Sequence, residues 1–193
     1  GIRAVEETLR SNSAIDTLIN NAGTAQMAPF LAGDVARHQA INTLNTTALM
    51  RLTYAILPRL AQNNRGTLVN IASVLALHVR AGSALYSATK AWVLSFTRGL
   101  QEEFADSNLR IQAVLPAATA TEIWSHSGVT VNDLPEGSVM TTEDMVDASL
   151  AGLDQVTIPP MHDAGLWDRY ETARLELFNS ARTGIPAPRY VKQ

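Results

Sequence analysis

Ser73-Val-Leu-Ala-Leu-His-Val-Arg-Ala-Gly-Ser-Ala-Leu-Tyr86-Ser-Ala-Thr-Lys90 is the stretch of this sequence that says most about its fold and its chemistry. Tyr86 and Lys90 are four residues apart, so on a helix they share one face and their side chains can interact. A lysine ammonium beside a phenol favours the phenolate, which predicts a pKa for Tyr86 below its usual value of roughly 10. Tyr86 is therefore a candidate general acid or base near neutral pH.

Ser73 lies thirteen residues before Tyr86, at the end of the apolar run 67–72, which is typical of a buried strand. Open α/β sheets place ligand groups at the carboxyl ends of their strands, so the Ser73 hydroxyl could hold a carbonyl or alcohol oxygen against Tyr86. A surface tyrosine beside a solvated lysine is the commoner explanation of such a pair taken alone. Ser87-Ala-Thr-Lys90 also has the pattern of a serine nucleophile, but its Ser-Asp-Asn and Lys-Thr-Gly partners do not occur in the sequence.

Strand-like and helix-like segments alternate along the chain, which predicts an α/β fold with a doubly wound, mostly parallel sheet. The predicted strands are 15–19, 66–73, 110–115 and 156–158, and the predicted helices are 1–10, 34–62, 84–105, 142–153 and 163–181, before a tail at 184–193. The helix at 34–62 carries an apolar stripe formed by Ile41, Leu44, Leu49, Leu52, Ile56 and Leu60. Residues 1–193 are predicted to form a single domain.

Composition excludes several classes of function. Of the 193 residues 46% are apolar and 17% charged, as in a folded globular protein. The net charge is -3 without a basic run, which argues against nucleic acid or an anionic membrane surface as a partner. There is no cysteine, and the four histidines lack metal-ligand spacing, so no metal site is expected. No apolar run approaches the ~18 residues that span a bilayer, and the expected location is the cytoplasm.

Residues 116–141 lack clear periodicity and carry apolar side chains among Gly, Ser and Pro. A loop of this length in a compact domain is usually a lid or a binding segment, so we predict a substrate loop that accepts a partly hydrophobic substrate. A mobile surface loop is the alternative.

Four features in the same order resemble the short-chain dehydrogenase/reductase family. They are the Ser73, Tyr86 and Lys90 spacing, the segment Asn20-Asn21-Ala22-Gly23, Asn45 in the preceding helix, and Leu115-Pro116 with Thr121. Ala117 departs from the pattern, because the family usually has glycine there. The resemblance covers residues 15–123 and implies a Rossmann-like fold.

The resemblance also implies an activity, the interconversion of an alcohol and a ketone or aldehyde by hydride transfer with NAD or NADP. Tyr86 would be the acid/base, Ser73 would hold the substrate oxygen, Lys90 would lower the Tyr86 pKa and bind the nicotinamide ribose, and Asn45 would support a proton relay through water. The cofactor-binding residues implied by the family are Asn20, Ala22, Gly23, Tyr86, Lys90, Pro116 and Thr121. The choice between NAD and NADP stays open.

The glycine-rich turn that binds the pyrophosphate in this family has no counterpart among the eleven glycines. The resemblance begins at about the fourth strand of the family, so the chain is expected to be the C-terminal two-thirds of such an enzyme, without its first three strands. We expect a preceding segment of several tens of residues. The alternative is a non-catalytic, truncated family member that acts as a binding or oligomerisation module.

A row of apolar side chains on the helix at 84–105 bears on assembly. Trp92, Phe96, Leu100 and Phe104 recur every four residues beside small residues, which is typical of a core or of a subunit interface. In the family this helix and the one before it often build a dimer interface. A homodimer or homotetramer is therefore expected.

Overall fold

The computed structural model describes residues 1–153, 155–181 and 184, and it divides the chain into two compact units, Gly1–Pro160 and Met161–Gln193. Each unit is described by itself. The predicted tail at 184–193 lies outside the described residues except for Gly184.

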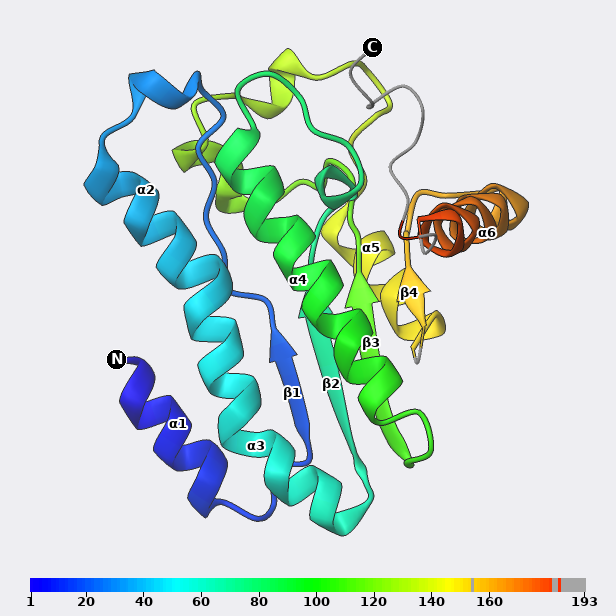
Figure 1. The fold of residues 1–193 in the computed structure, drawn as a ribbon. Helices are drawn as coiled ribbons and strands as arrows, with labels where there is room; N and C mark the ends of the chain where they lie inside the picture. Colours follow the sequence, from blue (N-terminus) through cyan, green and yellow to red (C-terminus); the bar gives the residue numbers. More distant parts are fainter. Residues whose placement is uncertain (154, 182–183, 185–193) are drawn as a thin grey trace. The chain divides into compact units, whose positions relative to one another are not determined.

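A parallel sheet of four strands forms the centre of the first unit, which confirms the predicted α/β class (Figure 1). The strands are β1 (Thr17–Asn20), β2 (Gly66–Ile71), β3 (Leu109–Val114) and β4 (Val156–Thr157), and they lie in the order β1-β2-β3-β4. All three pairings are parallel, with Asn20 opposite Asn70 and Ala113 opposite both Asn70 and Val156. The carboxyl ends of the strands therefore meet at one edge, where parallel sheets place their ligand groups.

Helices connect these strands. They are α1 (Ile2–Ser11), α2 (Val35–Asn42), α3 (Leu49–Asn63), α4 (Ala84–Glu103) and α5 (Thr142–Ala151), and the second unit contains α6 (Ala164–Ser180). Short 3-10 turns lie at η1 (Phe30–Ala32), η3 (Val74–Ala76), η4 (Glu122–His126) and η5 (Val131–Asp133). The long helix predicted at 34–62 is correct in extent, but a π-helical turn, η2 (Thr43–Ala48), interrupts it. No helix in the described ranges is both long enough and apolar enough to cross a bilayer.

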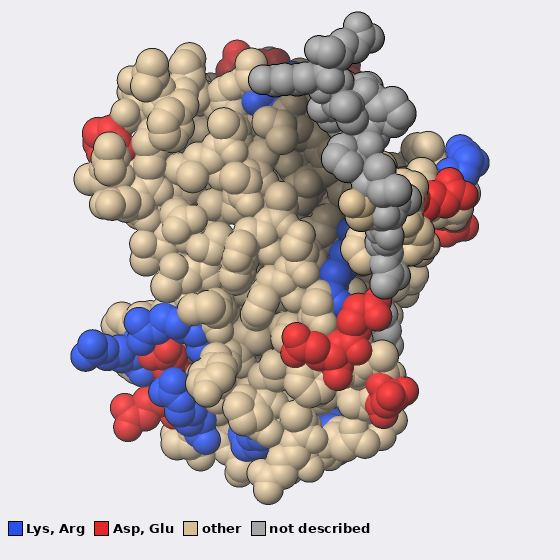
Figure 2. Space-filling model, in the orientation of Figure 1, with Lys and Arg blue, Asp and Glu red and all other residues tan. Residues whose placement is uncertain are grey.

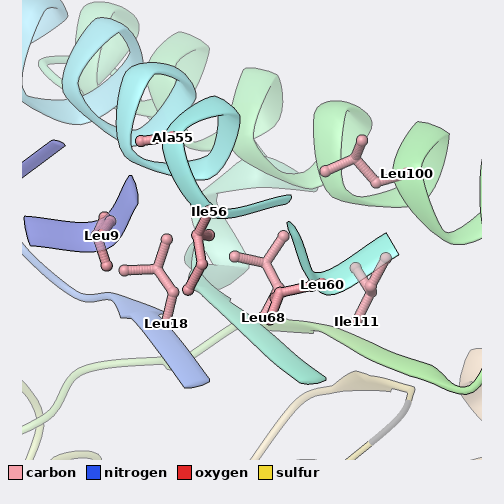
Figure 3. Close-up of a cluster of buried hydrophobic side chains, with 8 residues drawn as sticks. All are labelled: Leu9, Leu18, Ala55, Ile56, Leu60, Leu68, Leu100 and Ile111. Atoms are coloured by element: carbon pink, nitrogen blue, oxygen red, sulfur yellow. The ribbon is translucent and has the colours of Figure 1, made fainter. Parts of the chain in front are cut away.

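The main core lies on one face of the sheet, beneath α1, α3 and α4 (Figures 1 and 3). Its buried members are Leu9, Leu18, Ala55, Ile56, Leu60, Leu68, Leu100 and Ile111. On the opposite face, the buried side chain of Gln112 donates hydrogen bonds to the carbonyl oxygens of Ser149 and Gly152 at the end of α5. Helices therefore cover both faces at β3, as in a doubly wound sheet. The opposite face of β1 is less covered, because Ile19 is 55% exposed.

A partly buried ion pair holds α1 against α3. The Arg51 guanidinium donates two hydrogen bonds to the Glu6 carboxylate, each 2.7 Å long, and Glu6 is only 5% exposed. The hydrogen bonds from Arg51 lower the pKa of Glu6 below its usual value. On the face that Figure 2 draws, basic and acidic side chains lie together at the α1 end, whereas the middle of the face carries few charges.

Candidate active site

Ser73 and Tyr86 meet at the carboxyl edge of the sheet. Ser73 follows β2, and its hydroxyl accepts a 3.1 Å hydrogen bond from the Leu75 amide, which fixes it at the start of η3. Tyr86 lies in the first turn of α4, and the neighbouring Ser73 side chain acts to lower the pKa of its phenol. Both residues are buried. The strand-end serine and the helical tyrosine are thus brought together as the sequence predicts.

Lys90 lies one helical turn after Tyr86 and is 5% exposed. Its ammonium donates a 2.8 Å hydrogen bond to the carbonyl oxygen of Ile71 and lies 5.7 Å from the centroid of the Tyr86 ring. Burial disfavours the charged form and lowers the pKa of Lys90 to about 8. The ammonium is thus fixed to the end of β2, beside the phenol.

The predicted lowering of the Tyr86 pKa is wrong for this structure. Burial raises the pKa of Tyr86 above its usual value, and the Ser73 side chain opposes this shift only in part. The physical reason is desolvation, because a phenolate loses its water when the ring is enclosed. The Ile71 carbonyl also takes a hydrogen bond from the ammonium that was expected to favour the phenolate. At neutral pH Tyr86 is therefore a neutral phenol that can donate a proton.

Asn45 lies within the π-helical turn and is 2% exposed. Its side-chain oxygen accepts a 2.9 Å hydrogen bond from the Thr24 amide, and its Nδ2 donates to the Thr24 carbonyl at 2.9 Å and to Thr89 Oγ1 at 3.0 Å. Asparagine is a weak helix former, but here its side chain joins the loop after β1 to α4. π-Helical turns often occur at functional sites for such a reason.

The segment Asn20-Asn21-Ala22-Gly23 divides into a structural part and an open part. Asn20 is buried, and its Nδ2 donates to Thr53 Oγ1 and to Asn70 Oδ1, so this amide ties neighbouring strands together. Ala22 and Gly23 are exposed at the end of the strand. Asn20 therefore supports the site from within the core, and its predicted contact with a cofactor stays a prediction.

Gly23 lies beside the Lys90 ammonium and the Asn45 amide, at distances where a side chain would make ordinary contacts. A Cβ atom built on it would lie 3.4 Å from Asn45 Oδ1 and 3.5 Å from Lys90 Nζ. The backbone at Gly23 does not have the positive φ that favours glycine. The space next to the Gly23 Cα, bordered by the ammonium and the amide, is the Gly23 cradle.

Residues 116–141 are more ordered than the sequence suggests. A bridge pairs Thr119 with Met140, and the indole nitrogen of Trp124 donates a 2.7 Å hydrogen bond to the Thr119 carbonyl. The Met27 amide donates a 2.6 Å hydrogen bond to the Ser127 carbonyl, which attaches this segment to the loop after β1. Because these contacts fix both ends and the middle, the segment forms a wall beside the carboxyl edge of the sheet.

Pro116 and Thr121 differ in how they relate to the other predicted site residues. The Pro116 carbonyl accepts a hydrogen bond from the Val74 amide at 3.0 Å, directly after Ser73, so Pro116 lies at the site. Thr121 is exposed, and in the described part of the chain no hydrogen bond joins it to the other candidate residues. The described residues contain no group of three His, Cys, Asp or Glu side chains that could hold a metal ion.

Sequence reasoning missed Thr24 and Thr89. Thr89 is 2% exposed and stands between Asn45 and the main chain of Tyr86. The available signal was a hydroxyl residue three positions after Tyr86, at the spacing where a threonine can return a hydrogen bond to the backbone of its own helix.

Comparison with known proteins agrees with this geometry. Residues 2–131 match the family model described as short chain dehydrogenase. Among solved structures, a short-chain dehydrogenase from Sphingobium yanoikuyae in complex with NADPH is 45% identical with a TM-score of 0.91, over 98% of this chain and 74% of that one. A bulky-bulky ketone specific alcohol dehydrogenase from Comamonas testosteroni is 39% identical with a TM-score of 0.87, over 99% and 73% of the two chains.

Curated relatives are longer than this chain. An uncharacterized oxidoreductase of Staphylococcus saprophyticus is 32% identical over 151 residues, which are 78% of this chain and 62% of the relative. Two further relatives are matched over 48% and 44% of their lengths. The chain thus spans about half of the length of the curated relatives that it matches.

Proposed function

The chain belongs to the short-chain dehydrogenase family, and we propose that the protein containing it is an NADP(H)-dependent oxidoreductase that interconverts a ketone and an alcohol. The observation that carries this proposal is the buried hydroxyl pair of Ser73 and Tyr86, one helical turn from the Lys90 ammonium. The NADPH complex of the Sphingobium yanoikuyae relative supports NADP(H) over NAD. The proposed location is the cytoplasm.

The residues at the site fit the nicotinamide ribose end of such a cofactor. A lysine ammonium has three hydrogens to donate, and within the described residues a hydrogen bond to Ile71 engages one of them. The cradle at Gly23 opens beside this ammonium and beside Asn45 Oδ1. Donors of this kind suit the hydroxyl groups of a ribose, so Lys90 and the backbone at Ala22 and Gly23 would hold it. Tyr86, Pro116 and Thr121 would contact the same end of the cofactor.

Tyr86 acts as the general acid in the reducing direction. The Ser73 hydroxyl donates to the substrate carbonyl oxygen and polarises it, and Tyr86 delivers its phenolic proton to the same oxygen as the alcohol forms. A nicotinamide cofactor held beside Lys90 would supply the hydride. Burial keeps the Tyr86 phenol neutral until this step, since it raises the pKa of that group.

Lys90 and Asn45 complete the proton balance. Once Tyr86 has lost its proton, the ammonium 5.7 Å from the ring centroid stabilises the phenolate. Asn45 supports the return of a proton from solvent by holding the loop after β1 and the π-helical turn in place. Its main chain would hold the water through which that proton passes.

The substrate is a ketone with large apolar substituents. Residues 116–141 form a wall that carries Trp124 and Met140, and it is attached to the loop containing Met27. Side chains of this kind favour apolar groups. The likeness to the Comamonas testosteroni alcohol dehydrogenase points to the same substrate class.

A second copy of this chain is the proposed partner, and α3 and α4 provide the contact. Met50 and Tyr54 on α3 and Trp92 on α4 are exposed, and the surface over these helices carries few charges (Figure 2). Trp92 and Phe96 stack with their ring centroids 4.9 Å apart, which forms a flat apolar surface. Light scattering of the protein should give at least a dimer at micromolar concentration, and Trp92→Glu should lower the mass to that of a monomer. A monomeric wild type would contradict this assembly.

The decisive experiment mixes the purified protein with NADPH and then with ketones. We expect enhanced NADPH fluorescence on binding, and loss of its absorbance with a diaryl ketone but little with acetone. Binding without turnover on any ketone would favour the alternative of a non-catalytic binding module. Absence of binding to both NADPH and NADH would contradict the proposed function.

A further inference from the structure

Thr89 makes two hydrogen bonds, and both lead to residues of the candidate site. Its Oγ1 donates to the carbonyl oxygen of Tyr86 at 2.8 Å and accepts from Asn45 Nδ2 at 3.0 Å. A hydroxyl has a single hydrogen, so its donation to Tyr86 leaves only lone pairs for Asn45. The Thr89 hydroxyl can therefore only accept from Asn45, which places the Asn45 Nδ2 group, and not Oδ1, against α4.

Asn45 in turn connects Thr89 to the loop after β1. The Asn45 amide is held at both ends by the backbone of Thr24, and its remaining Nδ2 hydrogen goes to Thr89. Its Oδ1 then borders the Gly23 cradle, as does Lys90 Nζ. Thr89 is thus the one link in this network that lies on α4 itself, between Tyr86 and Lys90.

We propose that Thr89 is a positioning residue, whose hydroxyl attaches the Asn45 amide to the first turn of α4 and so fixes Tyr86 and Lys90 relative to the Gly23 backbone. This inference deepens the proposed function and rests on it for its effect on turnover. The π-helical turn η2 fits this role, because it brings the buried Asn45 side chain to both Thr24 and Thr89.

Thr97 provides a matched control on the same helix. It is as buried as Thr89, donates to the carbonyl of Val93 at 2.7 Å, and accepts from Asn70 Nδ2 at 2.9 Å. Its hydroxyl therefore has the same bonding pattern but leads into the core. Thr97→Val and Thr89→Val remove the same atom from similar surroundings. A difference between the two variants is therefore due to the position of the hydroxyl relative to the candidate site and not to its burial.

The first test is hydrogen exchange at the Thr24 amide, which needs no substrate or cofactor. With Thr89→Val we expect this amide to exchange on the order of tenfold faster, while the amide of Leu68 in β2 is unchanged. Thr89→Ser should restore slow exchange, and Thr97→Val should leave Thr24 slow. If Thr89→Val does not fold, Thr89→Ala serves for the same comparison. Equal acceleration at Thr24 and Leu68, or none at Thr24, would overturn the proposal.

The second test separates positioning from binding. Thr89→Val should lower kcat on the order of tenfold or more with the KM for NADPH nearly unchanged, because a small displacement of the acid costs rate more than affinity. Thr89→Ser should recover most of kcat. A loss that Thr89→Ser does not repair, or that Thr97→Val reproduces, would contradict a positioning role. If the wild type reduces no ketone, the proposed function fails, and exchange at Thr24 still decides whether Thr89 holds Asn45.

Discussion

The Lys90 ammonium donates a 2.8 Å hydrogen bond to the carbonyl oxygen of Ile71, the last residue of β2. This bond attaches the first turns of α4 to the sheet edge and directs the ammonium toward the Gly23 cradle. It also keeps a cation inside the protein, where burial lowers the pKa of Lys90 to about 8.

Replacing Lys90 by Met should stabilise the fold at neutral pH. The unfolded lysine titrates near 10.5, so between pH 8 and 10.5 the unfolded state binds more protons and stability rises with pH. Below pH 8 the burial of the Lys90 cation lowers the free energy of unfolding by up to about 3 kcal/mol. Lys90→Met removes this cost, but it also removes the hydrogen bond to Ile71, so the net gain is smaller. Urea unfolding should therefore give the variant a higher free energy of unfolding at pH 7, with a smaller gap at pH 10. A difference in the free energy of unfolding between variant and wild type that grows with pH would contradict the lowered pKa of Lys90.

Tyr86→Phe should reduce turnover by about 10²-fold or more, because it removes the proton donor and keeps the ring. The measurement is NADPH oxidation in the presence of a ketone. Tyr54→Phe is the matched control, since Tyr54 is 74% exposed and makes no part of the site. If Tyr86→Phe keeps turnover within about a factor of three of wild type, Tyr86 is not the general acid.

Arg51→Met should destabilise the protein, because the buried Glu6 carboxylate would lose two 2.7 Å hydrogen bonds and keep Arg10, 3.9 Å away, as its nearest charged partner. The pKa of Glu6 is lowered in the folded state, so its contribution is present above the unfolded pKa of 4.5 and is lost as the pH falls through the folded pKa. The gap in thermal midpoint between wild type and variant should therefore shrink on acidification below pH 4.5. Arg65→Met is the control, because the Arg65 side chain is 81% exposed and should change stability little.

Asn70→Leu should lower the free energy of unfolding by about 2–4 kcal/mol, since it leaves buried polar partners unsatisfied. Asn70 is fully buried, accepts from Asn20 Nδ2 at 2.9 Å and donates to Thr97 Oγ1 at 2.9 Å. A double-mutant cycle of Asn20→Ala with Asn70→Ala, followed by urea unfolding, should give a coupling energy of about 1 kcal/mol or more. Strictly additive effects would mean that the two amides do not act together.

The sequence predicts the sheet well, because the apolar runs before Asn20 and before Ser73 are short, continuous and followed by polar residues. It predicts the extent of the long helix but not its π-helical turn. The stripe predicted to include Leu44 is interrupted there, and Leu44 is 37% exposed whereas Asn45 is buried. A hydrophobic period of 3.6 residues contains no signal for such a turn, because hydrogen bonds of Asn45 to distant residues stabilise it.

The same limit applies to the site and to the surface of α4. Spacing brings Tyr86 and Lys90 onto one face, but the pKa of Tyr86 depends on how completely the fold encloses the phenol. The row of four predicted apolar residues also divides, because Leu100 lies in the core and Phe104 packs against it, whereas Trp92 is 36% exposed. Burial of this kind is decided by elements far away in the sequence.

Asn20 and Asn70 are partners in the register of β1 and β2 as well as in their hydrogen bond. A slip of β1 by one residue would turn Asn20 to the other face of the sheet and bring Ile19 into the core in its place. The slipped register is disfavoured, because the buried Asn70 amide would lose its hydrogen-bond partner. The pair therefore selects one register, because a sheet misaligned by one residue loses this hydrogen bond and leaves buried amide groups without partners.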